Sequence, residues 1–573
     1  MRSLLVLGAV LAAAALPATA DARDATVTSF DGTQIILSFH PSPQGGKAPT
    51  ILEGHGWGGS RETNPDATSD EGTGNVGVGA LRKAGFNVLT WDARGFGNSG
   101  GMVTVDSPDA EGRDVSALID WLAQQPEAQL DAAGDPRVGM TGVSYAGGIE
   151  LVTAARDKRI DAIAPIIAWH SLLTSLYKEE TVKGGWASAL VTLGIPTSKN
   201  RLDPHVTSAF TSGATTGKLS ADDRAWFDSR GPGDLVKQLT IPTFLVEGTA
   251  DTLFTLKEAI TNYEILKADN VPAKLLWFCG GHGVCLTGAG PKGHVEQTVV
   301  AWLRRYVAND AAVDTGPNFE WLADDAQWRS AADYPVAPGA PITATGSGTL
   351  ALNPADAASG TVATAGRAAN AVNVPVTAPA AAQVVGEPQL SLTYSGTGAP
   401  ADTYVFAQLV DEQRGVVVGN QATPIPLTLD GAAHTIARPL EAIAASAAKG
   451  TKYTLQLTGG TMLYGPTRVA GAITFSRIDL LLPTAAAAAV SSGTGLLETT
   501  RTCLSRRRFS IRVRGAHPKV TVAGKRVRVR KGRATVDLRG KPKGTVKVKV
   551  TAKRKGRTVR ETRVYKTCAP RTR

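Results

Sequence analysis

The sequence has no long uncharged apolar stretch beyond its first 22 residues. The stretch it does have follows Arg2, is apolar from Leu4 to Leu16 and ends in small residues. It is too short to cross a membrane and is typical of a secretory signal peptide, with a membrane helix as the alternative interpretation. We therefore expect residues 1–22 to be removed. The mature chain should then be secreted, extracellular or attached to the cell envelope, without a transmembrane segment.

Cysteine is scarce as well, with four in 573 residues. Cys279 and Cys285 lie on either side of His282, and Cys503 and Cys568 lie near the two ends of the C-terminal region. Four cysteines can pair in several ways, and local pairing is the simplest. The spacing therefore favours a Cys279–Cys285 bridge and a Cys503–Cys568 bridge. Two free, partly buried thiols beside His282 are the alternative.

Acidic residues are almost absent from residues 501–573, which hold 27 Lys and Arg but only 2 Asp and Glu. The whole chain has a net charge of +11, so the part before residue 501 is acidic on balance. Alternating valines and cations predict a small β-sandwich with one apolar face, and its cationic face could bind an anionic cell-envelope polymer. The plainer interpretation is that the cations keep edge strands from aggregating. Few aromatic side chains are present for stacking on bases, so we expect no nucleic acid partner.

Strand-like and helix-like stretches alternate over residues 23–315, which predicts a mostly parallel sheet covered by helices on both faces. One of these helices is predicted to start at Ser107-Pro108-Asp109, with the serine as its cap. The alternation is interrupted over residues 170–237, where short helical stretches predict a cap over the site. A surface excursion without substrate contact is the alternative.

The rest of the chain has the pattern of β domains. Charged residues become rarer over residues 316–484, and short alternating segments separated by Gly and Pro predict an all-β sandwich. Residues 485–500 are mostly small and are expected to form a linker to the basic domain, residues 501–573.

Ser144 follows an apolar stretch, residues 137–140, and precedes a helix-like one, residues 149–155, with glycine on both sides of it. A serine on a glycine-flanked turn between strand and helix is the way α/β-hydrolases expose a nucleophile. The usual pattern Gly-x-Ser-x-Gly has glycine where this chain has Ala146, so the match is incomplete. A structural turn is the alternative interpretation.

A serine nucleophile needs a base that takes its proton and an acid that orients the base. In this fold the acid and then the histidine follow the serine along the chain. Asp251 and His282 each come directly after an apolar strand-like stretch, where open α/β sheets place their chemistry. We therefore predict the triad Ser144, Asp251 and His282. Glu247 is the alternative acid, although it falls within its strand.

The charge that develops on the substrate's carbonyl oxygen needs hydrogen-bond donors that are fixed in advance. One donor should be the N–H of Tyr145, directly after the serine. The other should come from the loop after an early strand, where Trp57 N–H is our candidate. His55 in that loop precedes the serine, so we expect it to order the loop rather than act as the base. These residues imply no metal and no cofactor.

Four segments together resemble the Xaa-Pro dipeptidyl-peptidase/cocaine-esterase (CocE/NonD) family of serine hydrolases in the α/β-hydrolase superfamily. They are Gly142 to Gly147, Asp92 to Gly101, Asp251 to Phe254 and Gly281 to Gly283. The family pattern is Gly-x-Ser-Tyr-x-Gly, so the resemblance implies a glycine at 147. Over residues 24–483 it also implies a helical cap and a galactose-binding-like β jelly roll. The basic tail resembles only a generic secreted β-module.

The oxyanion loop departs from this resemblance. Family members with known activity use a tyrosine hydroxyl there, and Trp57 stands where we place that tyrosine. Indole has no hydroxyl, so stabilisation is left to backbone N–H groups, as in ordinary esterases. No acidic residues that would hold the free N-terminus of a dipeptide substrate can be identified.

Three functions compete. The slightly favoured one is a secreted serine hydrolase that cleaves an ester or amide bond through an acyl-enzyme, acting as an esterase on a small acyl ester. The second is release of Xaa-Pro dipeptides from a peptide substrate. The third is a non-catalytic cell-surface or carbohydrate-binding protein, against which the complete triad argues.

Overall fold

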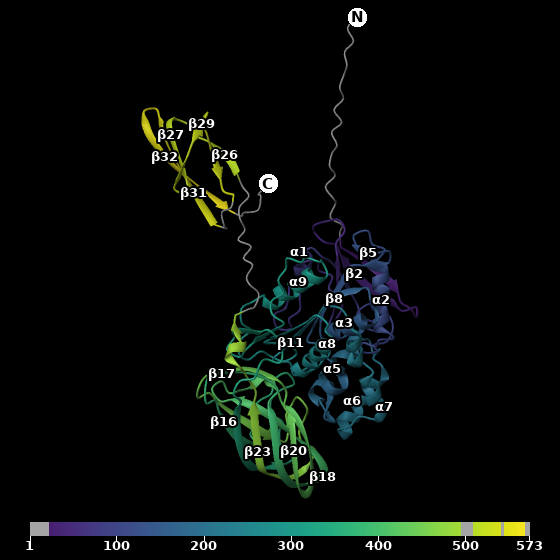
Figure 1. The fold of residues 1–573 in the computed structure, drawn as a ribbon. Helices are drawn as coiled ribbons and strands as arrows, with labels where there is room; N and C mark the ends of the chain where they lie inside the picture. Colours follow the sequence, from purple (N-terminus) through teal and green to yellow (C-terminus); the bar gives the residue numbers. More distant parts are fainter. Residues whose placement is uncertain (1–21, 494–507, 540–543, 568–573) are drawn as a thin grey trace. The chain divides into compact units, whose positions relative to one another are not determined.

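The computed structural model describes residues 22–493, 508–539 and 544–567. The chain divides into two compact units, Met1–Gly495 and Leu496–Arg573 (Figure 1). Each unit has its own apolar core. The expected signal peptide, apart from its last residue, and the pair Cys503 and Cys568 lie outside the described residues. Within the described ranges, no helix is both long and apolar enough to cross a membrane.

A large, mostly parallel sheet organises the first unit. Its described strands follow the order β1-β2-β4-β3-β7-β8-β11-β12-β13-β14-β25. The run from β4 to β13 is parallel, and the strands at both ends pair antiparallel. The strands span Arg23–Thr28 (β1), Gln34–His40 (β2), Thr50–Gly54 (β3), Asn87–Trp91 (β4), Val138–Val143 (β7), Ile160–Ile166 (β8), Thr243–Gly248 (β11), Ala273–Phe278 (β12), Phe319–Leu322 (β13), Trp328–Ala331 (β14) and Ser491–Ser492 (β25). A small hairpin, Leu130–Ala132 (β5) and Asp135–Pro136 (β6), precedes β7.

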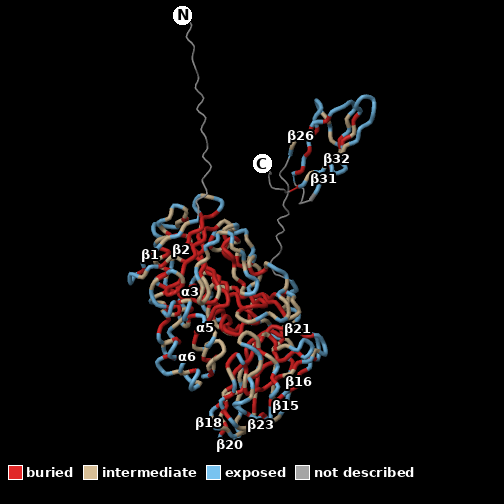
Figure 2. The backbone as a smooth tube through the Cα atoms, turned by 180° about the vertical axis from the view of Figure 1, so that it is seen from behind, coloured by how far each residue is buried: buried red, intermediate tan, exposed pale blue. Residues whose placement is uncertain are grey.

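Helices cover both faces of this sheet. Successive residues of β11 and β12 point to opposite sides, so Leu245 and Leu275 join one apolar cluster while Val246 and Leu276 join another. The first cluster includes residues of α2, α3 and α8, and the second includes residues of α1 and α9. Buried residues accordingly concentrate along the central strands (Figure 2). These helices span Val78–Lys83 (α1), Glu111–Leu122 (α2), Tyr145–Arg156 (α3), Leu256–Ala268 (α8) and His294–Tyr306 (α9).

The predicted start of α2 at Ser107 is wrong, because the helix begins at Glu111. Ser107 lies in a turn after Asp106, whose φ is 51°. The Glu111 carboxylate accepts the N–H groups of Thr104 at 2.7 Å and Ser107 at 3.0 Å. The side chain that fixes the loop before the helix therefore belongs to Glu111, the first residue of the helix.

The sheet extends beyond the boundary predicted at residue 315. β13 pairs with β12, β14 pairs with β13, and β25 pairs with β14. Residues 485–493 are also more than the expected linker. Thr484–Ala485 (β24) pairs with Ala382–Gly386 (β17), which lies earlier in the chain. A short turn, Ala487–Ala489 (η3), follows, and β25 then forms the last strand of the large sheet.

The insertion forms a helical cap, as predicted, between β8 and β11. It includes the helices α4, α5, α6 and α7, of which the sequence pattern did not indicate α6. Its elements span Leu172–Leu176 (α4), Tyr177–Lys178 (β9), Thr181–Val182 (β10), Gly184–Thr197 (α5), Pro204–Thr216 (α6), Ala221–Asp228 (α7) and Gly233–Gln238 (η1).

The following region is all-β, which confirms the predicted fold class. Two antiparallel sheets share one apolar core. The larger has β15, β23, β18, β22 and β16 in that order, with β19 and β20 pairing with β18, and the smaller has β21, β17 and β24. The bounds are Ile342–Leu352 (β15), Ala371–Thr377 (β16), Ala382–Gly386 (β17), Gln389–Asp411 (β18), Val416–Val417 (β19), Val418–Asn420 (η2), Thr423–Pro439 (β20), Ile443–Ala447 (β21), Lys452–Thr458 (β22) and Ala470–Leu482 (β23). We call this region the β-sandwich.

The second unit is a small basic β domain. Its described strands form the sheets β26-β30-β29 and β28-β27-β31-β32, whose valines and leucines meet in a common core. The strands span Arg508–Arg512 (β26), Ala516–Val522 (β27), Lys525–Val527 (β28), Val529–Arg530 (β29), Arg533–Asp537 (β30), Gly544–Arg554 (β31) and Arg557–Thr567 (β32).

Candidate active site

Ser144 lies on the sharp turn between β7 and α3. Its backbone has φ 57° and ψ −114°, a conformation that a non-glycine residue adopts only under strain. Its N–H donates to the carbonyl of Ile166 on the neighbouring strand β8 at 2.8 Å. A turn of this kind exposes the serine hydroxyl at the carboxyl end of the sheet, as predicted for a nucleophile.

Close packing under the turn explains the displaced glycine. A Cβ on Gly142 would lie 2.5 Å from the Cβ of Ala146, and a Cβ on Gly54 would lie 2.8 Å from it. The Ala146 methyl group thus occupies space that these two glycines leave open. A Cβ on Gly147 would lie 2.9 Å from the Cβ of Ala168 and 3.0 Å from a backbone oxygen. Position 147, rather than 146, is therefore where the turn excludes a side chain.

The structure brings the three predicted triad residues together. The Nε2 atom of His282 lies 2.8 Å from the Oγ of Ser144, and its Nδ1 atom lies 2.6 Å from Oδ2 of Asp251. The serine and histidine are thus at the separation that proton transfer requires. The carboxylate holds the imidazole in the orientation in which Nε2 can accept the serine proton.

Asp251 is fully buried, and its carboxylate is held by backbone donors. Oδ1 accepts the N–H groups of Leu253 at 2.9 Å and Phe254 at 2.8 Å, while Oδ2 accepts the N–H of His282 at 2.9 Å. Gly281 makes this approach feasible, because its φ is 108° and a Cβ there would lie 2.6 Å from the carboxylate. The Asp251 carboxylate can therefore occupy this place only because the residue before His282 is a glycine.

Glu247, the alternative acid, and His55, the other histidine considered as a base, both lie outside the triad. Glu247 is buried within β11, where burial raises the pKa of its carboxyl group well above its usual value. His55 bridges two loops, with Nδ1 2.7 Å from the Gly56 carbonyl oxygen and Nε2 accepting the N–H of Ala93 at 3.0 Å. Burial lowers the pKa of His55, which favours the neutral ring that such a bridge needs. It orders the oxyanion loop.

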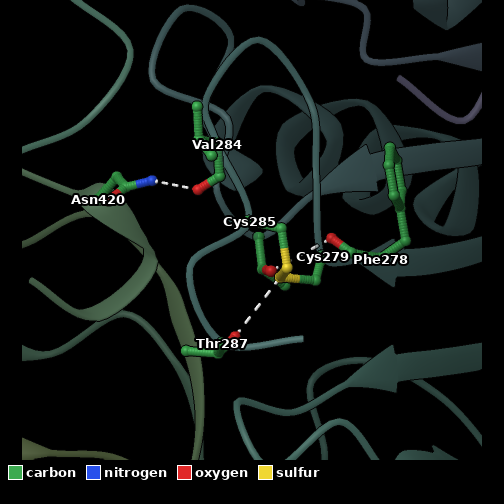
Figure 3. The surroundings of a disulfide bond; sticks show 7 residues. Phe278, Cys279, Val284, Cys285, Thr287 and Asn420 are labelled. Atoms are coloured by element: carbon green, nitrogen blue, oxygen red, sulfur yellow. Dashed lines mark hydrogen bonds between the residues drawn. A yellow bond between two sulfur atoms is a disulfide. The ribbon is translucent and has the colours of Figure 1, made fainter. Parts of the chain in front are cut away.

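A disulfide joins Cys279 and Cys285 around the histidine loop (Figure 3). The Sγ of Cys279 also lies 3.5 Å from Oγ1 of Thr287. Two residues from the loop's midpoint, the Val284 carbonyl accepts a hydrogen bond from Asn420 of the β-sandwich at 2.8 Å. The loop that carries His282 is therefore closed by a covalent bond and fixed from outside.

Trp57 and Tyr145, the candidate oxyanion donors, both lie beside Ser144. Their rings meet edge to face with centroids 5.5 Å apart. The indole N–H of Trp57 donates to the Leu190 carbonyl on α5 at 3.0 Å, and the Tyr145 hydroxyl donates to Glu111 at 3.3 Å. Both polar side-chain groups are thus engaged elsewhere. Only the two backbone N–H groups remain for a substrate oxygen, and the Trp57 N–H has no acceptor among the described residues.

Residues 31–284 match the family model of the X-Pro dipeptidyl-peptidases (S15 family). The hydrolase domain is similar to this family over these residues, and we call it the S15 domain. The matched segment ends two residues after His282, so it includes the whole triad and the cap. The match supports a hydrolase, and the three predicted triad residues lie in the matched part.

Among curated proteins, a similar one is an uncharacterized 31.7 kDa Escherichia coli protein from the traX-finO intergenic region. It is 29% identical over 135 residues, which are 24% of this chain and 42% of that protein. The chain spans less than half the length of the curated relatives that it matches first.

Solved structures resemble more of the chain. A CocE/NonD family hydrolase from Staphylococcus aureus has a TM-score of 0.57 at 14% identity, over 81% of this chain and 93% of that one. An aminopeptidase from a marine sediment Thaumarchaeota archaeon has a TM-score of 0.60 at 13% identity, over 81% of this chain and 96% of that one. At this identity the likeness shows the fold alone. Since 81% of the chain is more than the S15 domain, it extends into the β-sandwich.

An apolar cavity of about 100 Å³ opens beside Ser144 of the S15 domain. Trp57, Tyr145 and Phe254 line its catalytic end, and the cap lines the rest. The cap contributes residues of α4, α5, α6 and α7, such as Leu173, Leu190, Phe210 and Phe227. None of the described residues that line this cavity carries a charge. The cap therefore contacts the site, and α6, which the sequence pattern missed, forms part of the wall.

The β-sandwich also holds the catalytic loops of the S15 domain. Gln421 donates from Nε2 to the carbonyl of Asp251 at 2.8 Å, next to the contact of Asn420 with Val284. Both amide side chains are buried. They lie 170 and 136 residues from their partners along the chain, so no local pattern could have indicated them. The loops that carry Asp251 and His282 are thus both hydrogen-bonded to one turn of the β-sandwich.

Proposed function

We propose that this chain is a serine esterase that hydrolyses carboxylic esters with an apolar acyl group through an acyl-enzyme. The observation that carries the proposal is the uncharged, apolar cavity beside Ser144. An acyl chain of several carbons gains about 0.8 kcal/mol for each methylene that such a cavity buries. The similarity of the S15 domain to a hydrolase family supports the reaction class.

In this mechanism Ser144 Oγ attacks the ester carbonyl carbon while Nε2 of His282 takes the hydroxyl proton. The buried Asp251 carboxylate stabilises the imidazolium that forms. The carbonyl oxygen becomes an oxyanion that accepts the N–H groups of Trp57 and Tyr145. The intermediate collapses, and the leaving alcohol departs with the proton from Nε2. A water molecule then attacks the acyl-enzyme by the same steps in reverse, releasing the acid and restoring the serine.

The second candidate is Xaa-Pro dipeptidyl-peptidase activity, which the description of the matched family favours. Its substrate has a free ammonium group two residues from the scissile bond. Burying that charge in an apolar cavity without a carboxylate partner costs several kcal/mol. The described lining of the cavity offers no such partner, so we rank this activity below ester hydrolysis. A non-catalytic binding role would leave the geometry of Ser144, His282 and Asp251 without a purpose.

We also propose that the enzyme is exported. The pattern of residues 1–22 supports this, and so does the Cys279–Cys285 disulfide, since disulfides persist in oxidising compartments. Mass spectrometry of the protein from the culture medium should find an N-terminus near residue 23. An intact Met1 on a cell-associated protein would contradict export.

Labelling with a fluorophosphonate probe tests the serine mechanism, with Ser144→Ala as the control. The wild type should be labelled and the variant should not. A comparison of a p-nitrophenyl butyrate with an Ala-Pro-anilide then separates the two activities. Faster turnover of the anilide at equal concentration would replace the esterase proposal with the peptidase.

A further inference from the structure

The four-stranded sheet of the basic domain has an exposed outer face that holds several cations. In the four-stranded sheet β28-β27-β31-β32, valines at alternate positions point into the core, so the residues between them point outward. Six of the outward cations are Lys519, Arg526, Lys547, Lys549, Lys553 and Arg560, all of them exposed. Among the described residues, none of the six forms an ion pair. We call this surface the cationic face.

The strand register arranges these cations in alternation with threonines. One row across the sheet reads Arg526, Thr521, Lys549 and Thr562. The next row reads Lys519, Thr551 and Arg560. Because neighbouring strands are about 4.8 Å apart, successive cations of a row lie about 9–10 Å apart. Like charges are therefore not directly opposite each other, which lowers their mutual repulsion.

The other side of the domain is different. On the three-stranded sheet, Asp537 lies among the outward residues and pairs with Arg539 at 2.7 Å and with Arg508 at 3.8 Å. Glu561 belongs to β32, but it is opposite Val550, and it bonds Arg563 at 2.7 Å. Both described carboxylates of this domain thus lie away from the cationic face. Arg512, Arg530 and Arg533 on the three-stranded sheet also form no ion pair among the described residues, so the two faces differ in the presence of a carboxylate and not in the presence of unpaired cations.

We infer that the cationic face binds a linear acidic polysaccharide, one that carries carboxylate or sulfate groups along its sugar chain. The cations are spread over all four strands of the sheet rather than gathered around one point, which suits successive charges of a polymer, whose contacts add up. Between the cations, threonine hydroxyls can donate to and accept from sugar hydroxyls.

Two other polyanions fit less well. A single-stranded nucleic acid is usually held by aromatic side chains that stack on its bases, and no described residue of the cationic face has such a side chain. A lipid surface is usually entered by large apolar side chains, and Val564 is the one exposed large hydrophobic residue on the described part of this face. Neither absence affects a hydrated, flexible sugar chain.

Binding of the full chain to polygalacturonate tests the inference, with neutral dextran and phosphatidylglycerol vesicles as comparisons. We expect binding at low salt. The logarithm of the binding constant should fall linearly with the logarithm of the salt concentration, as for other polyanions. The variant Lys547→Thr/Lys549→Thr should bind about tenfold more weakly. Its matched control, Arg512→Thr/Arg533→Thr, removes the same charge from exposed strand positions of the other sheet and should bind nearly as the wild type does.

Ester hydrolysis and thermal unfolding of each variant check that the chain is intact. Equal weakening by the two pairs would mean that net charge alone attracts the polymer, and it would overturn the inference. So would no binding to polygalacturonate or equal binding to dextran. Tighter binding to the vesicles than to polygalacturonate would assign the face to a membrane instead.

Discussion

Asp251 and Glu247 are both buried carboxyl groups near the end of the same strand, but their hydrogen-bond partners differ. Asp251 accepts three backbone N–H groups and the His282 ring, all of which favour a carboxylate. Glu247 accepts the N–H of the next residue, Gly248, and burial raises its pKa well above the usual value. Burial therefore favours the protonated form of Glu247.

This contrast predicts unequal effects of two isosteric substitutions. Asp251→Asn should lower kcat by about 10³- to 10⁴-fold, because an amide cannot stabilise the imidazolium form of His282. Glu247→Gln should leave kcat unchanged, since an amide resembles a protonated carboxyl group. Steady-state hydrolysis of an aryl ester measures both. A large loss in Glu247→Gln would mean that the strand residue is the acid.

Glu53 on β3 links stability to pH. Burial raises its pKa from about 4.5 to about 8 in the folded chain. Between these values the folded state keeps a proton that the unfolded state has lost, so the free energy of unfolding falls as pH rises. The loss from this group is about 1.4 kcal/mol per pH unit, complete near pH 8.

The variant Glu53→Gln cannot titrate and should lose this dependence. Urea denaturation between pH 5 and pH 8 should give a shallower decline of the unfolding free energy for the variant than for the wild type. Other groups titrate in both proteins, so only the difference between the two slopes reports on Glu53. Parallel slopes would show that Glu53 is ionised in the folded chain.

At the scale of elements, the turn that contains Asn420 and Gln421 positions the acid loop. Gln421→Ala should lower kcat by about tenfold with little change in KM, because the Asp251 loop loses its bond at the carbonyl while the cavity is untouched. Gln408→Ala is the matched control. Gln408 is also buried in the β-sandwich and donates to Gly366 and Gln456, away from the catalytic loops.

Both variants should unfold at lower temperature than the wild type, since each leaves a buried partner unpaired. Only Gln421→Ala should turn over the ester more slowly when both are fully folded. The same fall in kcat for Gln421→Ala and Gln408→Ala would mean that the turn only stabilises the fold and does not position the Asp251 loop.

The side chains of helix α6 that line the cavity should determine which acyl chains the enzyme accepts. Val206, Ala209 and Phe210 of this helix line the cavity, whereas Thr211 is exposed. For p-nitrophenyl esters, kcat/KM should rise about fourfold for each added methylene until the cavity is full. Ala209→Phe should move the optimum to a shorter chain, and Thr211→Phe on the outer side should not. An optimum at acetate in the wild type would contradict the acyl assignment of the cavity.

The same helix shows where prediction from the sequence ends. The triad could be predicted because each of its members follows a strand whose apolar pattern is visible locally. Helix α6 is rich in serine and threonine and includes Gly213, which are poor helix formers. Its start signals, Asp203 as cap and Pro204 in the first turn, were present but isolated. Gln421 could not be found at all, because its role depends on a contact between two domains.

At the scale of the molecule, the hydrolase domain and the β-sandwich act as one catalytic body. Besides the two amide contacts, the cap is tied to the β-sandwich by an ion pair between Lys178 and Glu441. Arg468 donates to the Gly213 and Ala214 carbonyls at the end of α6, where a cation is favourable. The walls of the cavity are thus held by a domain that contributes no lining residue to it.

Every described residue of the triad, the oxyanion site, the cavity and the supporting turn belongs to the unit Met1–Gly495. The basic domain has a core of its own. A chain that ends at Gly495 should therefore hydrolyse esters with unchanged kcat/KM, yet lose its binding to polygalacturonate. Both are measured on the same preparation, beside the full chain. If hydrolysis fell together with binding, the basic domain would be a structural part of the enzyme, and the division of labour between the two units would be wrong.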